Sequence, residues 1–298
     1  MGNQFEFCVV AQDENWGHAR IEEAIIEIQR IEKLLTTFNN ASQTNQINEM
    51  AGIAPIMVDK EIFDLIDRSL RISTLTQGAF DITYGSIDKK LWNFDQNMTS
   101  LPDEQTAKEM VRLINFRNVI LNKQDQTVFL KEKGMRIGFG GIGKGYAADC
   151  AKAVMKSAGV KSGIVNAAGD LTVWGKQPNG EAWTIGIADP HKKYLSFASL
   201  QLTDTSVATS GNYEKYAVIN GVKYSHTIDP KTGYPVRGIK SVTIICSSAE
   251  ISDAMATPVM VMGIKAGIHL IDQIKGIACI VIDENDKIYT SKNINLIT

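Results

Sequence analysis

Apolar residues recur at steps of three and four in the first part of the chain. They put one apolar face on residues 20–35, formed by Ile21, Ile25, Ile28, Ile31 and Leu35. The opposite face carries Glu, Arg and Lys, so the pattern predicts an amphipathic helix. The same period predicts a second helix over 60–73 and a third that runs from Lys144 to the stop signal Gly159.

Short β-branched runs bounded by Gly, Asp or Ser predict strands at 162–169, 182–188, 241–248 and 276–283. The stretches 92–105 and 188–197 are polar and rich in turn residues. They predict connections that are too short to be interdomain linkers. Helices and strands are mixed along the chain, which predicts one continuous α/β or α+β domain over 1–298, either as a single body or as two lobes.

Composition narrows the choice of partners. The chain has 298 residues, 44% of them apolar, which is enough for a substantial core. With 31 basic and 33 acidic side chains the net charge is −2, so no broad field attracts nucleic acid or an anionic membrane. The four cysteines are scattered without C-x-x-C spacing and are expected to be small buried side chains. The apolar runs are too short to span a bilayer.

The segment "GFGGIGKGYAAD" at 138–149 resembles two kinds of phosphate loop. Gly145 stands where a P-loop needs Ser or Thr for magnesium, which argues against a nucleoside triphosphatase. Asp170 lies near the distance of a dinucleotide-binding acid, but on a Gly-rich turn, which argues against a dehydrogenase. Glycines before a helix still let a phosphate approach backbone amides. A tight turn that needs glycine for steric reasons is the alternative.

Two later segments carry titratable and oxygen-bearing side chains. Asp253 and Thr257 lie four residues apart, which on a helix places both on one face. Their oxygens suit a hard dication. Alternatively, Asp253 only interacts with the helix dipole and Thr257 only bonds within the helix. Pro258 makes the geometry of Thr257 less regular. His226 lies in "SHTIDP", a polar segment just before a turn, where its imidazole could meet a substrate hydroxyl.

Six segments follow one another in an order that resembles the ApbE family, the FAD:protein FMN transferases. They read "MGNQFEF", "TTFNNASQTNQIN", "GAFDIT" with "LWNF", the glycine loop, "NAAGD" and "ISDAMATPVMVMG". The chain departs from the family pattern at four positions: Asn3 replaces Thr, Phe38 replaces Tyr, Gly138 replaces an Asp and Ala168 replaces a Gly. The resemblance implies an α+β fold with mixed sheets and flanking helices, in which two lobes would surround a flavin-nucleotide cleft.

The resemblance also implies roles for particular residues. It implies Mg²⁺ ligation by the backbone carbonyl of Gly141, the carboxylate of Asp253 and the hydroxyl of Thr257, with His226 as the catalytic base. The residues that it implies at the FAD site are Met1, Phe38, Asn48, Ala79, Phe80, Asp81, Lys144, Asp170, Ser210, Gly211, Ile228 and Asp229. Tyr213 and Tyr216 are expected either to contact ligand or to pack in the core.

The activity that the resemblance implies is Mg²⁺-dependent transfer of FMN from FAD to a Ser or Thr of an acceptor protein, with release of AMP. A redox-complex subunit is one candidate acceptor. Two alternatives stay open: a pyrophosphatase that gives FMN and AMP, and a protein that binds or stores FAD without turnover. Asn48 lies where these activities would diverge. A chain beginning at "MGNQ" is expected in the cytoplasm, or as a periplasmic lipoprotein if a signal was removed.

Overall fold

The computed structural model describes residues 4–87, 100–189, 192–212, 216–219 and 221–294. The chain folds into two compact units. The first unit comprises Met1–Glu32, Ile142–Gly211 and Ile239–Thr298, and the second comprises Lys33–Gly141 and Asn212–Gly238. The chain therefore passes between the units at four points, one of which falls inside the glycine loop, directly after Gly141. No helix in the described ranges is long and apolar enough to cross a membrane.

The first unit is built on a seven-stranded sheet in which each described strand pair is antiparallel. Its order is β1 (Phe5–Val9), β5 (Gly163–Ala167), β6 (Asp170–Trp174), β9 (Thr205–Gly211), β12 (Ile239–Cys246), β13 (Ala278–Asp283) and β14 (Ile288–Thr290). Every residue of β13 is buried. A strand covered on both faces tends to have an almost continuous apolar sequence, which explains why the strand at 276–283 was predictable.

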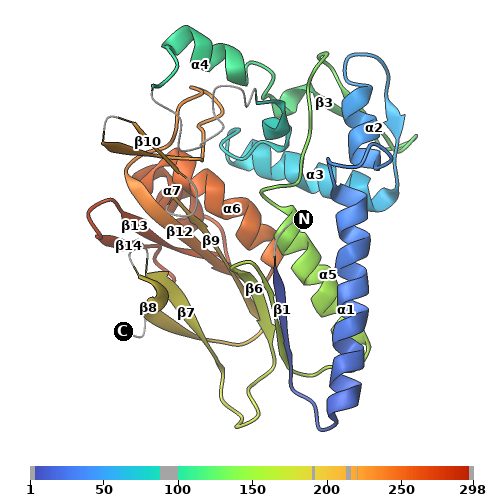
Figure 1. The fold of residues 1–298 in the computed structure, drawn as a ribbon, viewed down its shortest axis with the longest axis vertical. Coiled ribbons are helices and arrows are strands. Elements are labelled where there is room, and N and C mark those ends of the chain that lie inside the picture. Colours follow the sequence, from blue (N-terminus) through green and yellow to red (C-terminus); the bar gives the residue numbers. More distant parts are fainter. Residues whose placement is uncertain (1–3, 88–99, 190–191, 213–215, 220, 295–298) are drawn as a thin grey trace. The chain divides into compact units, whose positions relative to one another are not determined.

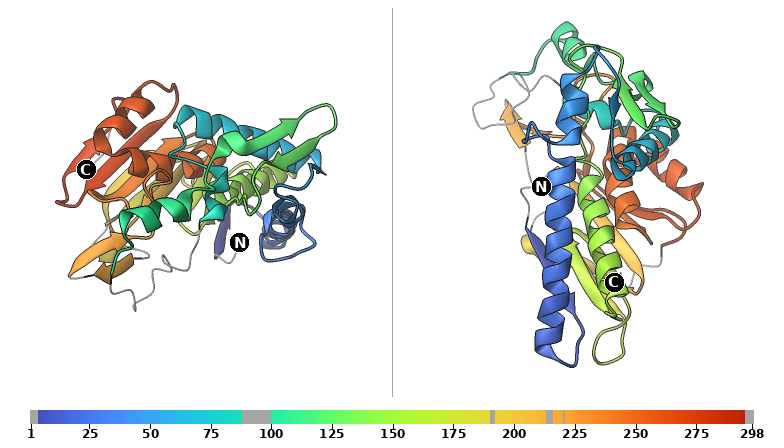
Figure 2. Two further views of the ribbon diagram at one scale, coloured as in Figure 1. Left: turned by 90° about the horizontal axis from the view of Figure 1, so that it is seen from above. Right: turned by 90° about the vertical axis from the view of Figure 1, so that its right-hand side faces the viewer.

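Helices cover one face of this sheet. They are α5 (Gly143–Ser157), α6 (Ala249–Met262) and α7 (Ile264–Asp272). The first part of α1 (Glu14–Leu35) belongs to the same unit. α5 and α6 lie side by side (Figure 1), and α5 runs alongside α1 in Figure 1 and in the right-hand view of Figure 2. Lys152 of α5 donates to the Thr172 hydroxyl of β6 at 3.0 Å, which identifies the helix-covered face.

A two-stranded hairpin covers the other face of the sheet, formed by β7 (Trp183–Asp189) and β8 (Lys192–Leu202). Trp183 and Ile185 pack on Val173, whose side chain points away from that of Thr172. The expectation that 188–197 is a connection was wrong for most of this stretch. Pairing with β7 satisfies the backbone of β8, and local side-chain polarity does not reveal such pairing.

The second unit contains the remaining elements. Its helices are α2 (Gln43–Glu49), α3 (Lys60–Leu75), η1 (Ile82–Ser86), α4 (Glu104–Val111) and η2 (Phe116–Asn118). Its strands are β2 (Ile56–Met57), β3 (Val119–Asn122), β4 (Thr127–Leu130), β10 (Tyr216–Ile219) and β11 (Val222–Ser225). They form a sheet of order β2-β4-β3 and a β10–β11 hairpin. The helices predicted at 20–35, 60–73 and 144–159 are confirmed, as are the four predicted strands.

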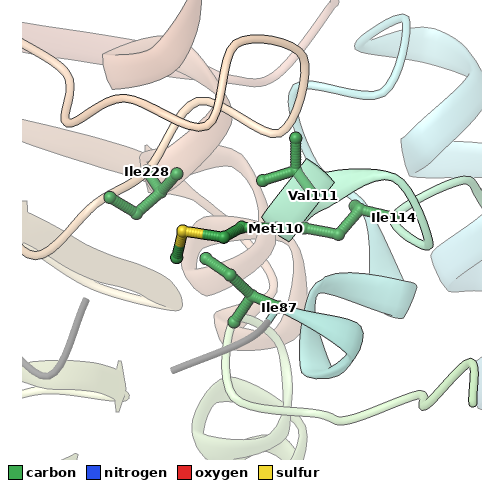
Figure 3. Packing of buried hydrophobic residues seen from close by; sticks show 5 residues of the cluster. All are labelled: Ile87, Met110, Val111, Ile114 and Ile228. Carbon is green, nitrogen blue, oxygen red and sulfur yellow. The ribbon is translucent and has the colours of Figure 1, made fainter. Parts of the chain in front are cut away.

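A buried cluster in the second unit ties α4 to the segment that follows β11. Met110 and Val111 pack with Ile87, Ile114 and Ile228 (Figure 3). Because Ile228 is two residues after His226, this cluster holds the backbone next to the predicted base.

Candidate functional site

The first unit brings together a lysine and two aspartates that the sequence separates widely. The Lys144 ammonium, in the first turn of α5, forms an ion pair with Asp170 at the start of β6. It also lies 3.7 Å from Oδ1 of Asp253 on α6. The side chains of Asp170 and Asp253 are 4% and 8% exposed, and that of Lys144 is 25% exposed. The two carboxylates therefore share one largely buried cation.

Two hydroxyls lie next to this trio in the fold. Ser210 Oγ, at the end of β9, is 3.1 Å from Thr257 Oγ1, one helical turn after Asp253. The preceding residue, Thr209, donates its amide to Oδ1 of Asp170 at 3.3 Å. We call the five residues Lys144, Asp170, Ser210, Asp253 and Thr257 the Lys144 cluster. Each was a predicted site residue. Ser210 is linked to the trio along β9, because its neighbour Thr209 bonds to Asp170, and Thr257 is linked to it along α6, which also carries Asp253.

The charges of the Lys144 cluster favour a further cation. One ammonium faces two carboxylates, so with all three ionised the formal charge is −1. Burial raises the pKa of Asp253, whereas the Lys144 charge and the Gly145 amide, which donates to Oδ2 at 3.0 Å, act to lower it. A carboxylate with neighbouring hydroxyls is a donor set that a hard dication accepts.

This donor set fits magnesium better than it fits softer metals. Across the described ranges, no three His, Cys, Asp or Glu side chains come together as a metal-binding group. Magnesium commonly takes only one or two carboxylates from a protein and completes its octahedron with substrate phosphates and water.

Gly145 has a steric reason to be glycine. A Cβ at this position would lie 2.0 Å from the carbonyl oxygen of Ala249, the first residue of α6. A Cβ on Gly138 or Gly140 would meet nothing within 4 Å. The P-loop hydroxyl is therefore incompatible with this α5–α6 packing, whereas an Asp at position 138 has space.

Several predicted FAD residues lie in the second unit. A Cβ on Gly141 would lie 3.4 Å from the ring of Phe80, so the predicted carbonyl ligand and Phe80 are neighbours. Ala79 and Phe80 are buried, and Phe38 is 97% exposed. Exposure leaves the Phe38 ring accessible to a planar ligand, although its contact with flavin stays a prediction.

Asn48 and Asp81 use their polar atoms within the protein. Asn48 clamps the backbone of Ile137: its amide donates to the carbonyl oxygen at 3.1 Å, and its carbonyl accepts from the backbone N–H at 2.7 Å. Asp81 accepts from the backbone and hydroxyl of Thr83 at 2.8 and 2.6 Å, and from the Phe116 amide at 2.9 Å. Burial raises the pKa of Asp81 against these bonds. Both side chains therefore shape the backbone of this unit.

The segment that carries His226 is anchored on both sides. His226 is half-buried and follows β11 directly. The Ile228 amide donates to the Tyr84 hydroxyl at 3.2 Å, and burial raises the pKa of Tyr84 to about 12. Asp229 Oδ1 accepts from the Lys231 amide at 2.8 Å, so this carboxylate stabilises the following turn.

Some predicted residues cannot be placed. Met1, Tyr213 and the "LWNF" segment at 91–94 lie outside the described residues. Tyr216, on β10, is 42% exposed, so of the two roles expected for this tyrosine, packing in the core is wrong. Gly211 ends β9 next to Ser210.

The sequence predictions did not include Tyr84 and Asp149, two residues that support the site structurally. Asp149 closes the quoted glycine segment, so an isolated carboxylate among small residues was a visible signal. Nothing in the local sequence marked Tyr84.

The fold and the Lys144 cluster define an α+β protein with a largely buried oxygen-donor site beside a helix start. The ApbE family model matches residues 1–281, and the chain belongs to the ApbE family. It is 30% identical to an FAD:protein FMN transferase of Treponema pallidum (strain Nichols), over 93% of this chain and 80% of the relative. It is 31% identical to one of Klebsiella pneumoniae (strain 342), over 89% and 82%.

Solved structures agree with this assignment. The ApbE protein of Thermotoga maritima matches with a TM-score of 0.88 and 31% identity, over 98% of this chain and 94% of that one. The flavin transferase ApbE of Vibrio cholerae matches with a TM-score of 0.85 at 24% identity, over 98% and 94%, and supports the fold alone. The predicted family and the α+β fold class are confirmed.

Proposed function

We propose that the chain is an FAD:protein FMN transferase, which moves FMN from FAD to a Ser or Thr hydroxyl of an acceptor protein. The observation that carries this proposal is the 30% identity to a relative of that name over 93% of the chain. The Lys144 cluster supports it, because phosphoryl transfer is catalysed mainly by positioned positive charge and hard-ion ligands.

Asp253, Thr257 and the Gly141 carbonyl are the residues that would hold Mg²⁺. When bound, the ion supplies positive charge for the pyrophosphate oxygens and the departing AMP. Lys144 is largely buried and positively charged, and it binds a phosphate oxygen of FAD. Ser210 supports Thr257 through the hydroxyl contact at 3.1 Å.

His226 takes the proton from the acceptor hydroxyl. The hydroxyl oxygen then bonds to the FMN-side phosphorus, and the bond from that phosphorus to the bridging oxygen breaks. The electron pair of the broken bond leaves with AMP, and FMN stays on the acceptor through a phosphoester. Tyr84 and the cluster around Met110 keep the His226 segment in place.

The products formed from FAD separate this activity from its two alternatives. The protein is incubated with FAD and Mg²⁺, with and without a lysate of its host, and the products are separated by chromatography. AMP without free FMN, together with flavin fluorescence on a denatured protein band, is the expected result. Equal AMP and free FMN would indicate a hydrolase, and unchanged FAD would indicate a binding protein.

His226→Ala tests the base. Transfer is expected to fall by roughly 10²–10⁴, the usual contribution of general-base catalysis, while FAD affinity in equilibrium dialysis stays unchanged. His18→Ala is the matched control, because His18 is a 70% exposed histidine on α1. Full transfer by His226→Ala would remove this residue from the mechanism, and loss of FAD binding with transfer would make it structural.

A further inference from the structure

Asp149, in the middle of α5, caps the N-terminus of a different helix. Its Oδ2 accepts from the Ser248 hydroxyl at 2.8 Å and from the Glu250 amide at 3.1 Å. Its Oδ1 accepts from the Ala249 amide at 3.1 Å. Both carboxylate oxygens therefore bind the first turn of α6, where free amides and the helix dipole favour an anion.

A second contact joins the same two helices one turn earlier. The Gly145 amide donates to Asp253 at 3.0 Å, and the missing side chain of Gly145 lets the Ala249 carbonyl approach. Gly145 and Asp149 are four residues apart and lie on one face of α5. α5 therefore holds α6 at its N-terminus through Asp149 and at the next turn through Gly145. Two attachment points limit both sliding and rotation of α6.

α6 carries the two side chains that the proposed function assigns to the cation, Asp253 and Thr257. Their positions depend on the axial position and rotation of this helix. Pro258 follows Thr257 and cannot donate a helix hydrogen bond, so α6 is less stiffly bonded just where Thr257 lies.

We propose that Asp149 is a positioning residue: its carboxylate fixes the start of α6 and so holds Asp253 and Thr257 in the geometry that binds the divalent cation. This inference rests on the proposed function. Asp149 acts through α6 and contacts neither FAD nor the reacting atoms. Changes in residues that orient metal ligands typically weaken metal affinity 10- to 100-fold.

The test compares Asp149→Asn with Ser248→Ala. Asn keeps the size of the side chain, but its NH₂ group cannot accept from the α6 donors. Ser248→Ala removes the cap that accepts from the Ile251 amide at 3.3 Å, together with the hydroxyl that donates to Asp149, yet the Ala249 and Glu250 amides still donate to both oxygens of the Asp149 carboxylate. Both changes weaken the same helix end, but only the first removes an acceptor of the α6 amides and the negative charge that faces the helix N-terminus.

The measurement is binding of Mn²⁺, used as a paramagnetic probe, to each protein in the presence of FAD, followed by electron paramagnetic resonance. The Mg²⁺ midpoint of FAD-dependent thermal stabilisation is recorded beside it. Asp149→Asn is expected to raise both midpoints at least tenfold, and saturating Mg²⁺ should restore FAD binding. The two midpoints of Ser248→Ala should stay within about twofold of wild type, even if its melting temperature falls by as much as that of Asp149→Asn.

An unchanged midpoint in a folded Asp149→Asn protein, or equal midpoint shifts in the two variants, would overturn the proposal. If Asp149→Asn does not fold, Asp149→Glu takes its place. It keeps the charge but moves the carboxylate outward by one carbon, so a displaced α6 should still raise the midpoint, and a wild-type midpoint would overturn the inference. A wild-type protein that binds neither Mn²⁺ nor FAD would overturn the proposed function as well.

Discussion

Lys144→Met removes the cation that two buried carboxylates share. Methionine keeps an apolar chain of similar length, so the main loss is the charge. Removing one partner of a buried ion pair costs about 3–5 kcal/mol because the other charge is left uncompensated. Lys144 is 25% exposed, and the Thr209 and Gly145 amides still stabilise the two carboxylates, so we expect a smaller loss of about 2–3 kcal/mol.

This loss should be visible as a lower melting temperature. For a chain of this size, 1 kcal/mol corresponds to roughly 2 °C, so the variant should melt about 4–6 °C below wild type in EDTA. Added Mg²⁺ should then stabilise Lys144→Met more than wild type. In the variant the ion no longer competes with an ammonium 3.7 Å from Asp253. The measurement is thermal unfolding by circular dichroism, in EDTA and across a Mg²⁺ titration without FAD.

Lys152→Met is the matched control. Lys152 lies on the same helix and bonds to a neutral hydroxyl, that of Thr172, and burial lowers its pKa. Its removal should cost about 1 kcal/mol, the usual net value of one hydrogen bond, with no change in the Mg²⁺ response. If the melting temperature of Lys144→Met in EDTA equals that of wild type, or if Mg²⁺ stabilises the variant no more than wild type, the ammonium is not the counter-ion of these carboxylates.

Two further predictions concern packing around the site. Gly145→Ala should destabilise the protein by about 2 kcal/mol or more and weaken Mg²⁺ binding, because its Cβ would lie 2.0 Å from the Ala249 carbonyl oxygen. Gly138→Ala is the control and should change stability little, since its Cβ would meet nothing within 4 Å. Urea unfolding of both variants measures the difference. Tyr84→Phe leaves the Ile228 amide without its acceptor and should lower the free energy of unfolding by about 1–3 kcal/mol. FMN transfer should fall while Mg²⁺ binding stays unchanged. Transfer at the wild-type rate would show that the His226 segment does not need this bond.

The sequence predicted those parts of the fold whose signal is local. α1 and α3 have a period of three to four. The strand at 276–283 has an almost continuous apolar run because both of its faces are covered, and the strand at 241–248 is marked by β-branched residues between serines. The strand at 182–188 was predicted and is β7, but its partner β8 was missed because β8 is defined by pairing with residues up to 19 positions away, from Trp183↔Leu202 inward. The position at which the two units divide was not predicted either, since it depends on contacts between distant segments.

The site was predictable to the extent that family motifs mark it. Their order named Lys144, Asp170 and Asp253, and the structure brings these three together. No motif shows which hydrogen bonds a side chain makes. Asn48 could therefore be assigned to FAD, although its amide clamps the backbone of Ile137, 89 residues away. Asp149 escaped notice for the same reason, because its partner Ser248 is 99 residues away.

The glycine loop shows how far the likeness to a phosphate loop extends. In a P-loop, the residue after the lysine supplies a hydroxyl to magnesium. Here that residue is Gly145. Its lack of a side chain leaves room for the Ala249 carbonyl, and its amide donates a hydrogen bond to Asp253. The close approach brings α6 onto α5, and α6 supplies the carboxylate and the hydroxyl of Thr257. In the proposed cation site these two ligands would come from α6, whereas a P-loop takes its hydroxyl from the residue after the lysine. We therefore expect glycine at position 145 to be needed for the α5–α6 packing on which the proposed site depends.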